Sequence, residues 1–325
     1  MSEPRFSILI TCYNQRDFIR DAVDSALLQT HGLREVIVVD DGSTDGSLEV
    51  LEQYSDSIQL FHFPSNRGAI EARNYAASLA SGEYLVFLDG DDLLMPWALD
   101  AYERVIQERD PKILLAQVVW FSGEIPSEKE EHIPGAIEFV EYDALMRKDR
   151  TAGLFASAFV VKRKTFEEAG SWTPGIFHLD LQDIFSKLGY AGRTILICSP
   201  ATVFYRTHAS NSIRTVPPFL KMQHRLMAKE RRGEYPGGRS GLFERRAWFG
   251  GQVVFCVNGA LHAGLYKEAV KLIASGWSMI LAALLRRIII SFKGRHPVQT
   301  LDFAGGLAQA EPLSASLSQS GPSKR

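Results

Sequence analysis

The sequence contains few cysteines, and they form no recognisable pattern. Cys12, Cys198 and Cys256 are isolated and odd in number, which excludes a disulfide framework and a zinc site built from paired cysteine ligands. The first residues also lack the basic head, apolar stretch and small-residue cleavage site of an export signal. We therefore expect a cytoplasmic protein, with attachment to the inner face of the cell membrane as a further possibility.

Several common enzyme signatures are missing as well. The sequence has no GxGxxG after its first strand-like segment, no GxxxxGK[ST], no GxSxG and no HExxH. These absences argue against Rossmann-type redox enzymes, P-loop NTPases, serine hydrolases and zinc peptidases.

The chain also lacks a long uninterrupted apolar run. Leu272 to Leu285 is free of charge, but Arg286 and Arg287 separate it from the apolar Ile288 to Phe292. A membrane-spanning helix needs roughly 20 apolar residues. The run therefore favours an amphipathic helix lying on a membrane surface, or a helix packed in the core, over a span.

Charge is nearly balanced in the whole chain but unevenly distributed along it. The net charge is −2, yet Phe219 to Val298 carries 14 Lys and Arg against 4 Asp and Glu, a net charge of +10. This asymmetry indicates that the C-terminal region faces an anionic partner, either a membrane surface or a phosphate-bearing substrate. No nucleic-acid-binding motif accompanies the basic residues, so we expect no nucleic acid partner.

The first 110 residues alternate strand-like and helix-like segments. Apolar runs predict strands at 6–12, 36–39, 58–63 and 84–88, and helical spacing predicts helices near 18–27, 47–54, 69–80 and 97–107. This order is typical of an α/β fold with a mostly parallel sheet flanked by helices, whose ligand lies beyond the carboxyl ends of the strands.

The later part of the chain has a looser pattern. We expect a strand over 113–121, an exposed loop over 122–135, and apolar runs at 155–161 and 194–197 that return to the sheet. The resulting division is a main domain over 1–216, a basic helical extension over 217–300 that contacts a membrane, and a disordered tail over 301–325.

Each of the four early strands is followed by polar residues. These are Thr11 to Asn14, Asp40 to Asp45, Asn66 to Gly68, and Asp89 to Asp92. Because parallel strands end at the same edge of a sheet, these segments should lie together. The sequence therefore places a candidate site at that edge.

The two acidic strand ends favour a site over simple turn chemistry. Three carboxylates in Asp89-Gly90-Asp91-Asp92 repel one another, and a hard divalent cation that also binds phosphate would compensate them. The alternative is a capping turn before the next helix. Asp40-Asp41-Gly42 taken alone is typical of an ordinary turn. Two acidic segments that each follow a buried strand in one half-domain are not expected from turns alone.

Two further side chains have open roles. Arg73 lies on the helix after Asn66 to Gly68, and it could neutralise a diphosphate, pair with an aspartate or simply be exposed. His208 follows an apolar strand, where a lone histidine is more often structural than a ligand.

Taken together, four ordered motifs resemble those of family 2 glycosyltransferases. They are Ile10 to Asn14, Val39 to Asp45, Asn66 to Ala69 with Ala72 to Asn74, and Leu88 to Asp92. The resemblance covers roughly residues 6 to 215. It is specific to the family and says little about the substrate.

The resemblance implies a GT-A fold, a nucleotide-sugar donor and inversion at the anomeric carbon. By position, the nucleotide-sugar would be bound by Thr11, Tyr13, Asp40, Asp41, Arg73, Asp89 and Gly90. Asp91, in the DxD motif, would bind Mn²⁺ or Mg²⁺, and His208 matches a late histidine that often completes the metal site in this fold.

One departure from the family concerns the catalytic base. Many relatives carry Glu-Asp at the start of a helix where this chain has Asp180-Leu181, so the base is displaced or reassigned. We slightly favour Asp183 over Asp180 as the base, because the apolar Ile184 and Phe185 that follow it should anchor its backbone.

The resulting hypothesis is a metal-dependent, inverting transfer of a sugar from a nucleotide diphosphate donor, preferably a UDP-sugar. The acceptor is a saccharide or a lipid-linked molecule. The product belongs to the synthesis of cell-surface polysaccharide or glycolipid. Transfer to a polyprenyl phosphate is an alternative that the basic C-terminal region would suit. A sugar-nucleotide-binding protein without catalysis is another, because Leu181 replaces an acidic residue.

Overall fold

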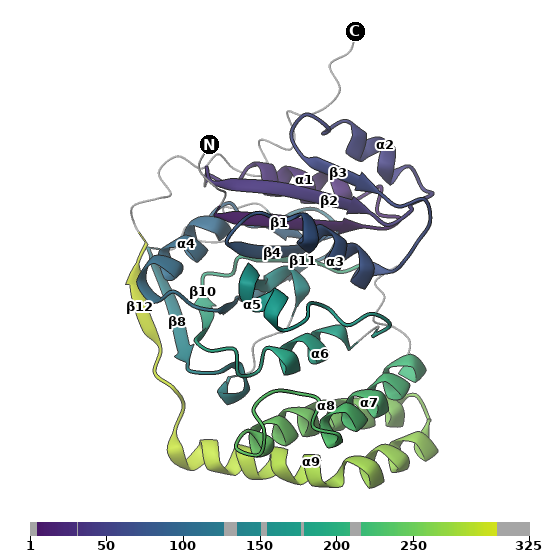
Figure 1. Ribbon diagram of the computed structural model, residues 1–325, viewed down its shortest axis with the longest axis vertical. Helices are drawn as coiled ribbons and strands as arrows, with labels where there is room; N and C mark the ends of the chain where they lie inside the picture. The colour runs from purple at the N-terminus through teal and green to yellow at the C-terminus, as the bar shows by residue number, and fades with distance from the viewer. Residues whose placement is uncertain are drawn as a thin grey trace.

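The structure, a computed structural model, describes residues 5–30, 32–126, 135–150, 155–176, 179–208 and 216–303. Figure 1 shows a sheet with helices packed against it, and below the sheet a separate layer formed by the last three helices. The expected α/β class is confirmed.

The first four strands form the parallel half of the main sheet. They are β1 (Phe6–Cys12), β2 (Arg34–Asp40), β3 (Gln59–His62) and β4 (Tyr84–Asp89), in the order β3-β2-β1-β4. All seven residues of β1 are buried, as expected for a strand that helices cover on both faces. The strands expected from the apolar runs are confirmed.

Four helices connect and cover these strands. They are α1 (Ile19–Leu27), α2 (Ser47–Glu52), α3 (Ala69–Leu79) and α4 (Ala98–Arg109), close to the predicted ranges. Ile19, Ala22, Val23 and Ala26 form the buried side of α1, because residues three or four apart share one helix face.

Beyond β4 the main sheet becomes mixed. It continues with β9 (Phe159–Lys162), β6 (Ile113–Leu115), β10 (Thr194–Ser199), β8 (Ala136–Tyr142) and β12 (Gln299–Asp302). Among these pairs β6 and β10 are parallel, and the other pairs are antiparallel.

The strand predicted over 113–121 is two strands in different sheets. β6 belongs to the main sheet, whereas β7 (Val118–Phe121) joins β5 (Leu93–Leu94) and β11 (Val203–Arg206) in a small second sheet. The backbone N–H of Ala116 donates to Ala158, and the carbonyl of Gln117 accepts from Thr202. Adjacent residues between β6 and β7 therefore bond to different segments of the chain, and the apolar run over 113–121 forms two strands instead of one.

The C-terminal region is helical, as expected. It consists of α7 (Val216–Arg231), α8 (Leu242–His262) and α9 (Tyr266–Lys293). The chain then returns to the sheet, because β12 pairs antiparallel with β8. Leu301 and Asp302 therefore belong to a strand rather than to the expected tail, while 304–325, and 127–134 of the expected loop, lie outside the described residues.

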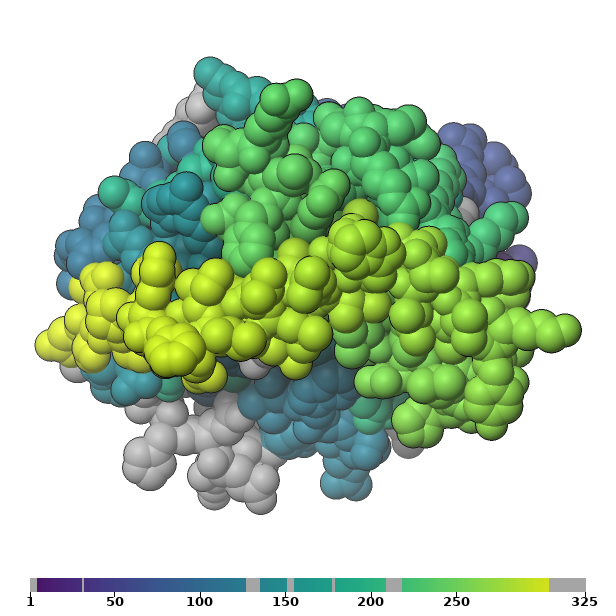
Figure 2. Space-filling view, turned by 90° about the horizontal axis from the view of Figure 1, so that it is seen from below, coloured from purple at the N-terminus to yellow at the C-terminus, as the bar shows by residue number. Residues whose placement is uncertain are grey.

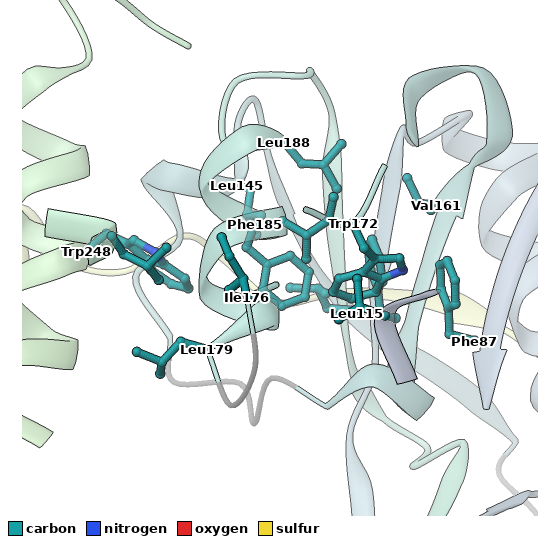
Figure 3. Close-up of a cluster of buried hydrophobic side chains, with 14 of the residues drawn as sticks. Phe87, Leu115, Leu145, Val161, Trp172, Ile176, Leu179, Phe185, Leu188 and Trp248 are labelled. Carbon is teal, nitrogen blue, oxygen red and sulfur yellow. The ribbon is translucent and has the colours of Figure 1, made fainter. Parts of the chain in front are cut away.

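The core has one cluster on each face of the sheet. One contains Phe6, Ile8 and Ile10 of β1, and the other contains Leu9. Figure 3 shows the second cluster reaching from Phe87 through Trp172 and Phe185 to Trp248 of α8. Phe185 lies on α6 (Asp180–Lys187), which follows α5 (Arg163–Glu168). The apolar core thus joins the sheet, α6 and the C-terminal helices.

Candidate active site

A cleft lies at the carboxyl ends of the parallel strands, where the sequence places the site. Its volume is about 400 Å³. The lining residues come from the ends of β1, β2, β4 and β11 and from α3: Thr11, Cys12, Tyr13, Asn14, Gln15, Asp41, Asn66, Ala69, Ala72, Arg73, Asp89, Asp91, Tyr205 and His208. Seven of the residues predicted from the sequence therefore line this cleft: Thr11, Tyr13, Asp41, Arg73, Asp89, Asp91 and His208.

Arg73 is the central cation of the cleft. Its Nη2 donates to Asp89 Oδ1 and its Nη1 to Asp180 Oδ2, each over 2.7 Å. Burial opposes the charge on Arg73, but Asp89 and then Asp180 raise its pKa. Arg73 is therefore a fixed cation, and in this structure it is paired with two aspartates at the edge of the cleft.

Asp91 and His208 meet across the cleft. Asp91 Oδ2 lies 2.8 Å from His208 Nε2, and the ring of Phe18 packs on the imidazole with centroids 4.5 Å apart. Burial, followed by the neighbouring Asp89, raises the pKa of Asp91. The structure thus brings together a carboxylate and an imidazole from distant parts of the chain in a place that favours a positive charge.

Asp92, the last residue of the acidic turn, has a structural role. Its carboxylate is buried and accepts from Ser157 Oγ over 2.5 Å and from the backbone N–H of Arg206 over 2.9 Å. Burial, then Asp91 and Asp89, raises its pKa well above the usual value. Asp92 therefore ties β4 to β11, which carries His208 at its end.

Asp40 and Asp41 are neighbours in the sequence but differ in their hydrogen-bond partners. Asp40 is fully buried below the cleft, where its Oδ2 lies 2.9 Å from His62 Nδ1. Asp41 lines the cleft, and its oxygens accept from the backbone N–H groups of Arg67 at 2.7 Å and Gly68 at 2.8 Å. Asp41 thereby fixes the loop that leads into α3, whereas Asp40 is not among the residues that line the cleft.

The backbone of the site leaves no room for a side chain at Gly90. A Cβ atom at this position would lie 2.4 Å from Gln15 Oε1 and 2.9 Å from the carbonyl oxygen of Thr11. The Gly90 N–H donates to that same carbonyl over 3.0 Å. The acidic turn can therefore pack against the end of β1 only without a side chain here.

The two candidate bases on α6 point in different directions. The side chain of Asp180 is 20% exposed and is bound to Arg73 at the edge of the cleft. Asp183 is buried, and its Oδ1 accepts from Lys229 Nζ at 2.5 Å and from Tyr235 OH at 2.6 Å. The slight preference for Asp183 thus conflicts with its position, because its carboxylate is occupied by the C-terminal helical layer.

Some cleft residues were not assigned from the sequence. Gln15, Asn66 and Tyr205 also line the cleft. Asn66 belongs to the polar segment that follows β3, Gln15 lies three residues after the end of β1, and Tyr205 lies within β11. Uncharged polar and aromatic residues are common throughout the chain, so they are a weaker signal of a site than clustered charge.

The arrangement suits a polyanionic ligand with a cation. Arg73 supplies a guanidinium group, and Asp91 and His208 supply oxygen and nitrogen ligands. Thr11 and Tyr13 line the same cleft. Because Asp89 and Asp180 already balance the charge of Arg73, a bound cation would help to hold the anion. Such a set at the carboxyl edge of an α/β sheet can hold a nucleotide diphosphate.

One protein family matches the first half of this chain. The family model for glycosyl transferase family 2 matches residues 7–170, a range that contains the β1, β2, α3 and β4 parts of the cleft. α6, β11 and the C-terminal helices lie outside it.

Individual relatives match over about a third of this chain. A Bacillus subtilis (strain 168) protein named "Putative teichuronic acid biosynthesis glycosyltransferase TuaG" is 41% identical over 108 residues, 32% of this chain and 42% of that protein. Escherichia coli (strain K12) YibD, an uncharacterized glycosyltransferase, is 32% identical over 122 residues, 37% of this chain and 35% of that protein. The matches thus span less than half of these relatives.

Among solved structures, residues 1–349 of S. aureus TarS in complex with UDP-GlcNAc superpose with a TM-score of 0.68. The match covers 86% of this chain and 81% of that one, at 17% sequence identity. This likeness in fold covers more of the chain than the family model does.

Proposed function

Because this chain belongs to glycosyl transferase family 2, we propose that it transfers a sugar from a nucleotide diphosphate donor, preferentially a UDP-sugar, to a hydroxyl group. The observation that supports this most is the cleft in which Arg73, Asp89, Asp91 and His208 meet at the ends of β4 and β11. The preference for uridine rests on the UDP-GlcNAc bound to TarS, which has the same fold.

In this proposal the nucleotide binds along the ends of β1 and β2. Thr11, Tyr13 and Asp41 border the part of the cleft that would receive the base and ribose. Tyr13 is 46% exposed, so its ring is available to pack on a base. Asp89 would contact the ribose, and Arg73 beside it would neutralise the diphosphate.

A divalent cation, Mn²⁺ or Mg²⁺, fits the donor set at Asp91 and His208. Among the described residues no three acidic, histidine or cysteine side chains form a complete metal site. Cations of this kind often use one or two protein ligands plus substrate phosphates. Burial and the neighbouring Asp89 raise the pKa of Asp91, and a bound cation would stabilise the charged form of this carboxylate. Once bound with the donor, the ion would offset the negative charge that develops on the leaving diphosphate.

Asp180 is the better placed general base. In a single displacement, the acceptor oxygen forms a bond to the anomeric carbon while the bond from that carbon to the diphosphate oxygen breaks. Asp180 takes the proton of the acceptor hydroxyl, and the nucleoside diphosphate leaves with the bonding electron pair. One displacement inverts the anomeric configuration, and Arg73 stabilises the departing charge.

The acceptor is proposed to be a saccharide or lipid-linked saccharide used in cell-surface polysaccharide synthesis, in the cytoplasm or at the inner membrane face. Support comes from the name of TuaG, which refers to teichuronic acid synthesis. A polyprenyl phosphate acceptor is the alternative that the basic C-terminal region favours.

A donor-binding protein without catalysis remains the second candidate. Leu181 occupies the position at which many relatives carry an acidic residue, and it packs partly buried against the core. Asp180, the neighbouring carboxylate, is engaged with Arg73. These two observations favour this candidate, and turnover decides between the two.

Thermal shift with a set of nucleoside diphosphates and Mn²⁺ tests the donor site. A ligand at about 100 times its dissociation constant stabilises the protein by about 2.7 kcal/mol. We expect UDP with Mn²⁺ to raise the melting temperature more than GDP, CDP or ADP. Equal shifts with all four would remove the preference for uridine, and no shift with any of them would remove the donor site.

A further inference from the structure

Helix α9 carries a continuous row of large apolar side chains on its outer face. The row, called here the α9 outer face, has residues three or four apart, each between 45% and 87% exposed: Tyr266, Val270, Ile273, Trp277, Leu281, Leu284, Ile288 and Phe292. Such spacing keeps all of them on one side of a helix. Figure 2 shows α9 lying across the underside of the molecule.

The opposite side of α9 is already packed. Leu272, Gly276 and Met279 are buried, and a Cβ atom on Gly250 of α8 would lie 1.9 Å from the carbonyl oxygen of Met279. The two backbones therefore approach closely, and α9 cannot turn its outer face inward. A continuous exposed apolar surface of this kind marks an interaction site.

The charges beside the outer face identify the partner. From Tyr266 to Arg295 the chain has six basic residues and one acidic residue. Five of the six are exposed, and the sixth, Arg286, is partly buried. The acid, Glu268, is paired with Lys271 at 2.7 Å. A second copy of the chain docked through a two-fold axis would oppose the same cations to each other. We infer that the α9 outer face docks in the plane of an anionic lipid bilayer, with its apolar side chains among the acyl chains and its cations near the headgroups.

The structure favours an in-plane orientation over a span. Within the described residues α9 is the one helix long and apolar enough to cross a membrane. However, α8 ends at His262, shortly before α9 begins, and β12 after α9 pairs with β8 of the main sheet. A spanning helix would place its two ends on opposite sides of the bilayer, whereas both ends of α9 are held by the same domain.

Arg286 reinforces this orientation. Its Nη2 donates to the carbonyl oxygens of Met146 at 2.7 Å and Lys148 at 2.6 Å. The guanidinium therefore points into the protein and fixes the C-terminal half of α9 against the main domain. The outer face is left directed away from that contact.

A basic cavity lies at the C-terminal end of α9. It has a volume of about 320 Å³, and Arg286, Lys293, Arg295 and His296 are among its lining residues. Asp149 also lines it, but its carboxylate accepts from the N–H and Nδ1 of His296. This cavity adjoins the end of the apolar row, so it can receive the phosphate of a lipid headgroup while the row enters the acyl region.

Vesicle sedimentation of the full chain tests this inference without any measurement of sugar transfer. The vesicles contain phosphatidylcholine alone, or phosphatidylcholine and phosphatidylglycerol at a molar ratio of about two to one. We expect binding to the anionic vesicles that weakens as salt is added. The variant Leu281→Ser/Ile288→Ser should lower the partition coefficient roughly 10- to 100-fold, because it removes exposed apolar area.

Leu33→Ser is a matched control, because Leu33 is 45% exposed and Leu281 is 47% exposed, and Leu33 lies outside α9. It should bind vesicles like the wild type. Arg287→Gln/Lys293→Gln should lose the preference for phosphatidylglycerol. Brominated lipids should quench tryptophan fluorescence in the wild type and much less in Trp277→Phe.

Three results would overturn the inference. The first is that the wild type does not bind anionic vesicles at low salt. The second is that the α9 variant and the Leu33 control bind vesicles equally. The third is that the wild type forms a stable dimer, which Leu281→Ser/Ile288→Ser dissociates, and does not bind vesicles. The last result would assign the outer face to a second copy of the chain.

Discussion

Arg73 on α3 and Asp180 at the start of α6 are joined by a hydrogen-bonded ion pair of 2.7 Å between Nη1 and Oδ2. The same guanidinium binds Asp89 at the end of β4. The first turn of α6 is therefore fixed to the edge of the cleft, and a carboxylate outside the family-matched range lies beside Arg73.

Asp180→Asn should reduce turnover by roughly 10²- to 10⁴-fold, because a positioned proton acceptor is lost. The dissociation constant of UDP should change much less, since Asn keeps the volume and can still accept from Arg73. Steady-state kinetics with one acceptor, together with UDP titration, separates the two effects. Near-normal turnover would show that Asp180 is not the base.

Asp183→Asn should act on stability, in contrast. It removes one partner of a buried pair with Lys229 and leaves the ammonium uncompensated, a change that typically costs about 3 to 5 kcal/mol. Urea unfolding should show this loss. Lys229→Met in the same background should recover part of it, since the two changes share one interaction. A folded Asp183→Asn protein of wild-type stability that has lost turnover would restore Asp183 as the base.

The contrast between Asp180 and Asp183 shows where sequence reasoning stops. The early strands and helices follow from apolar periodicity, and the polar strand ends indicate where the cleft lies. The direction of two carboxylates three residues apart depends on Lys229 and Tyr235, which come much later in the chain. No local pattern contains that information.

Two features of the fold escaped prediction for a similar reason. The apolar run over 113–121 divides because Ala116 and Gln117 bond to segments that follow them by many residues. β12 is a strand of four residues whose pairing with β8 is entirely long-range. Short strands that pair with distant segments are difficult to predict from the local sequence.

Asp91→Asn should abolish the dependence of UDP binding on Mn²⁺ and leave the melting temperature of the free protein nearly unchanged. The substitution removes an anionic ligand from the cleft and preserves volume. Asp92→Asn is the informative comparison. Because Asp92 joins β4 to β11, this substitution should lower the melting temperature of the free protein. Calorimetric titration of UDP with and without Mn²⁺ measures the first effect, and metal-dependent binding that survives in Asp91→Asn would contradict the assignment.

Gly250→Ala should destabilise the C-terminal layer, because its Cβ would collide with the carbonyl oxygen of Met279 on α9. Gly251→Ala on the same helix meets nothing within 4 Å. It should be neutral or stabilising by up to about 1 kcal/mol, the usual difference between Gly and Ala inside a helix. Thermal unfolding of the pair checks this, and equal melting temperatures would mean that α8 and α9 are not in close contact.

The most direct test of the proposed reaction is release of UDP from a set of UDP-sugars, measured with and without saccharide and lipid-linked acceptors. We expect the wild type with Mn²⁺ to release UDP above the no-enzyme background, and Asp91→Asn and Asp180→Asn to fall toward that background. A wild-type protein that binds UDP with Mn²⁺ yet releases none from any UDP-sugar or acceptor combination would contradict the proposed transfer and identify a donor-binding protein without transferase activity.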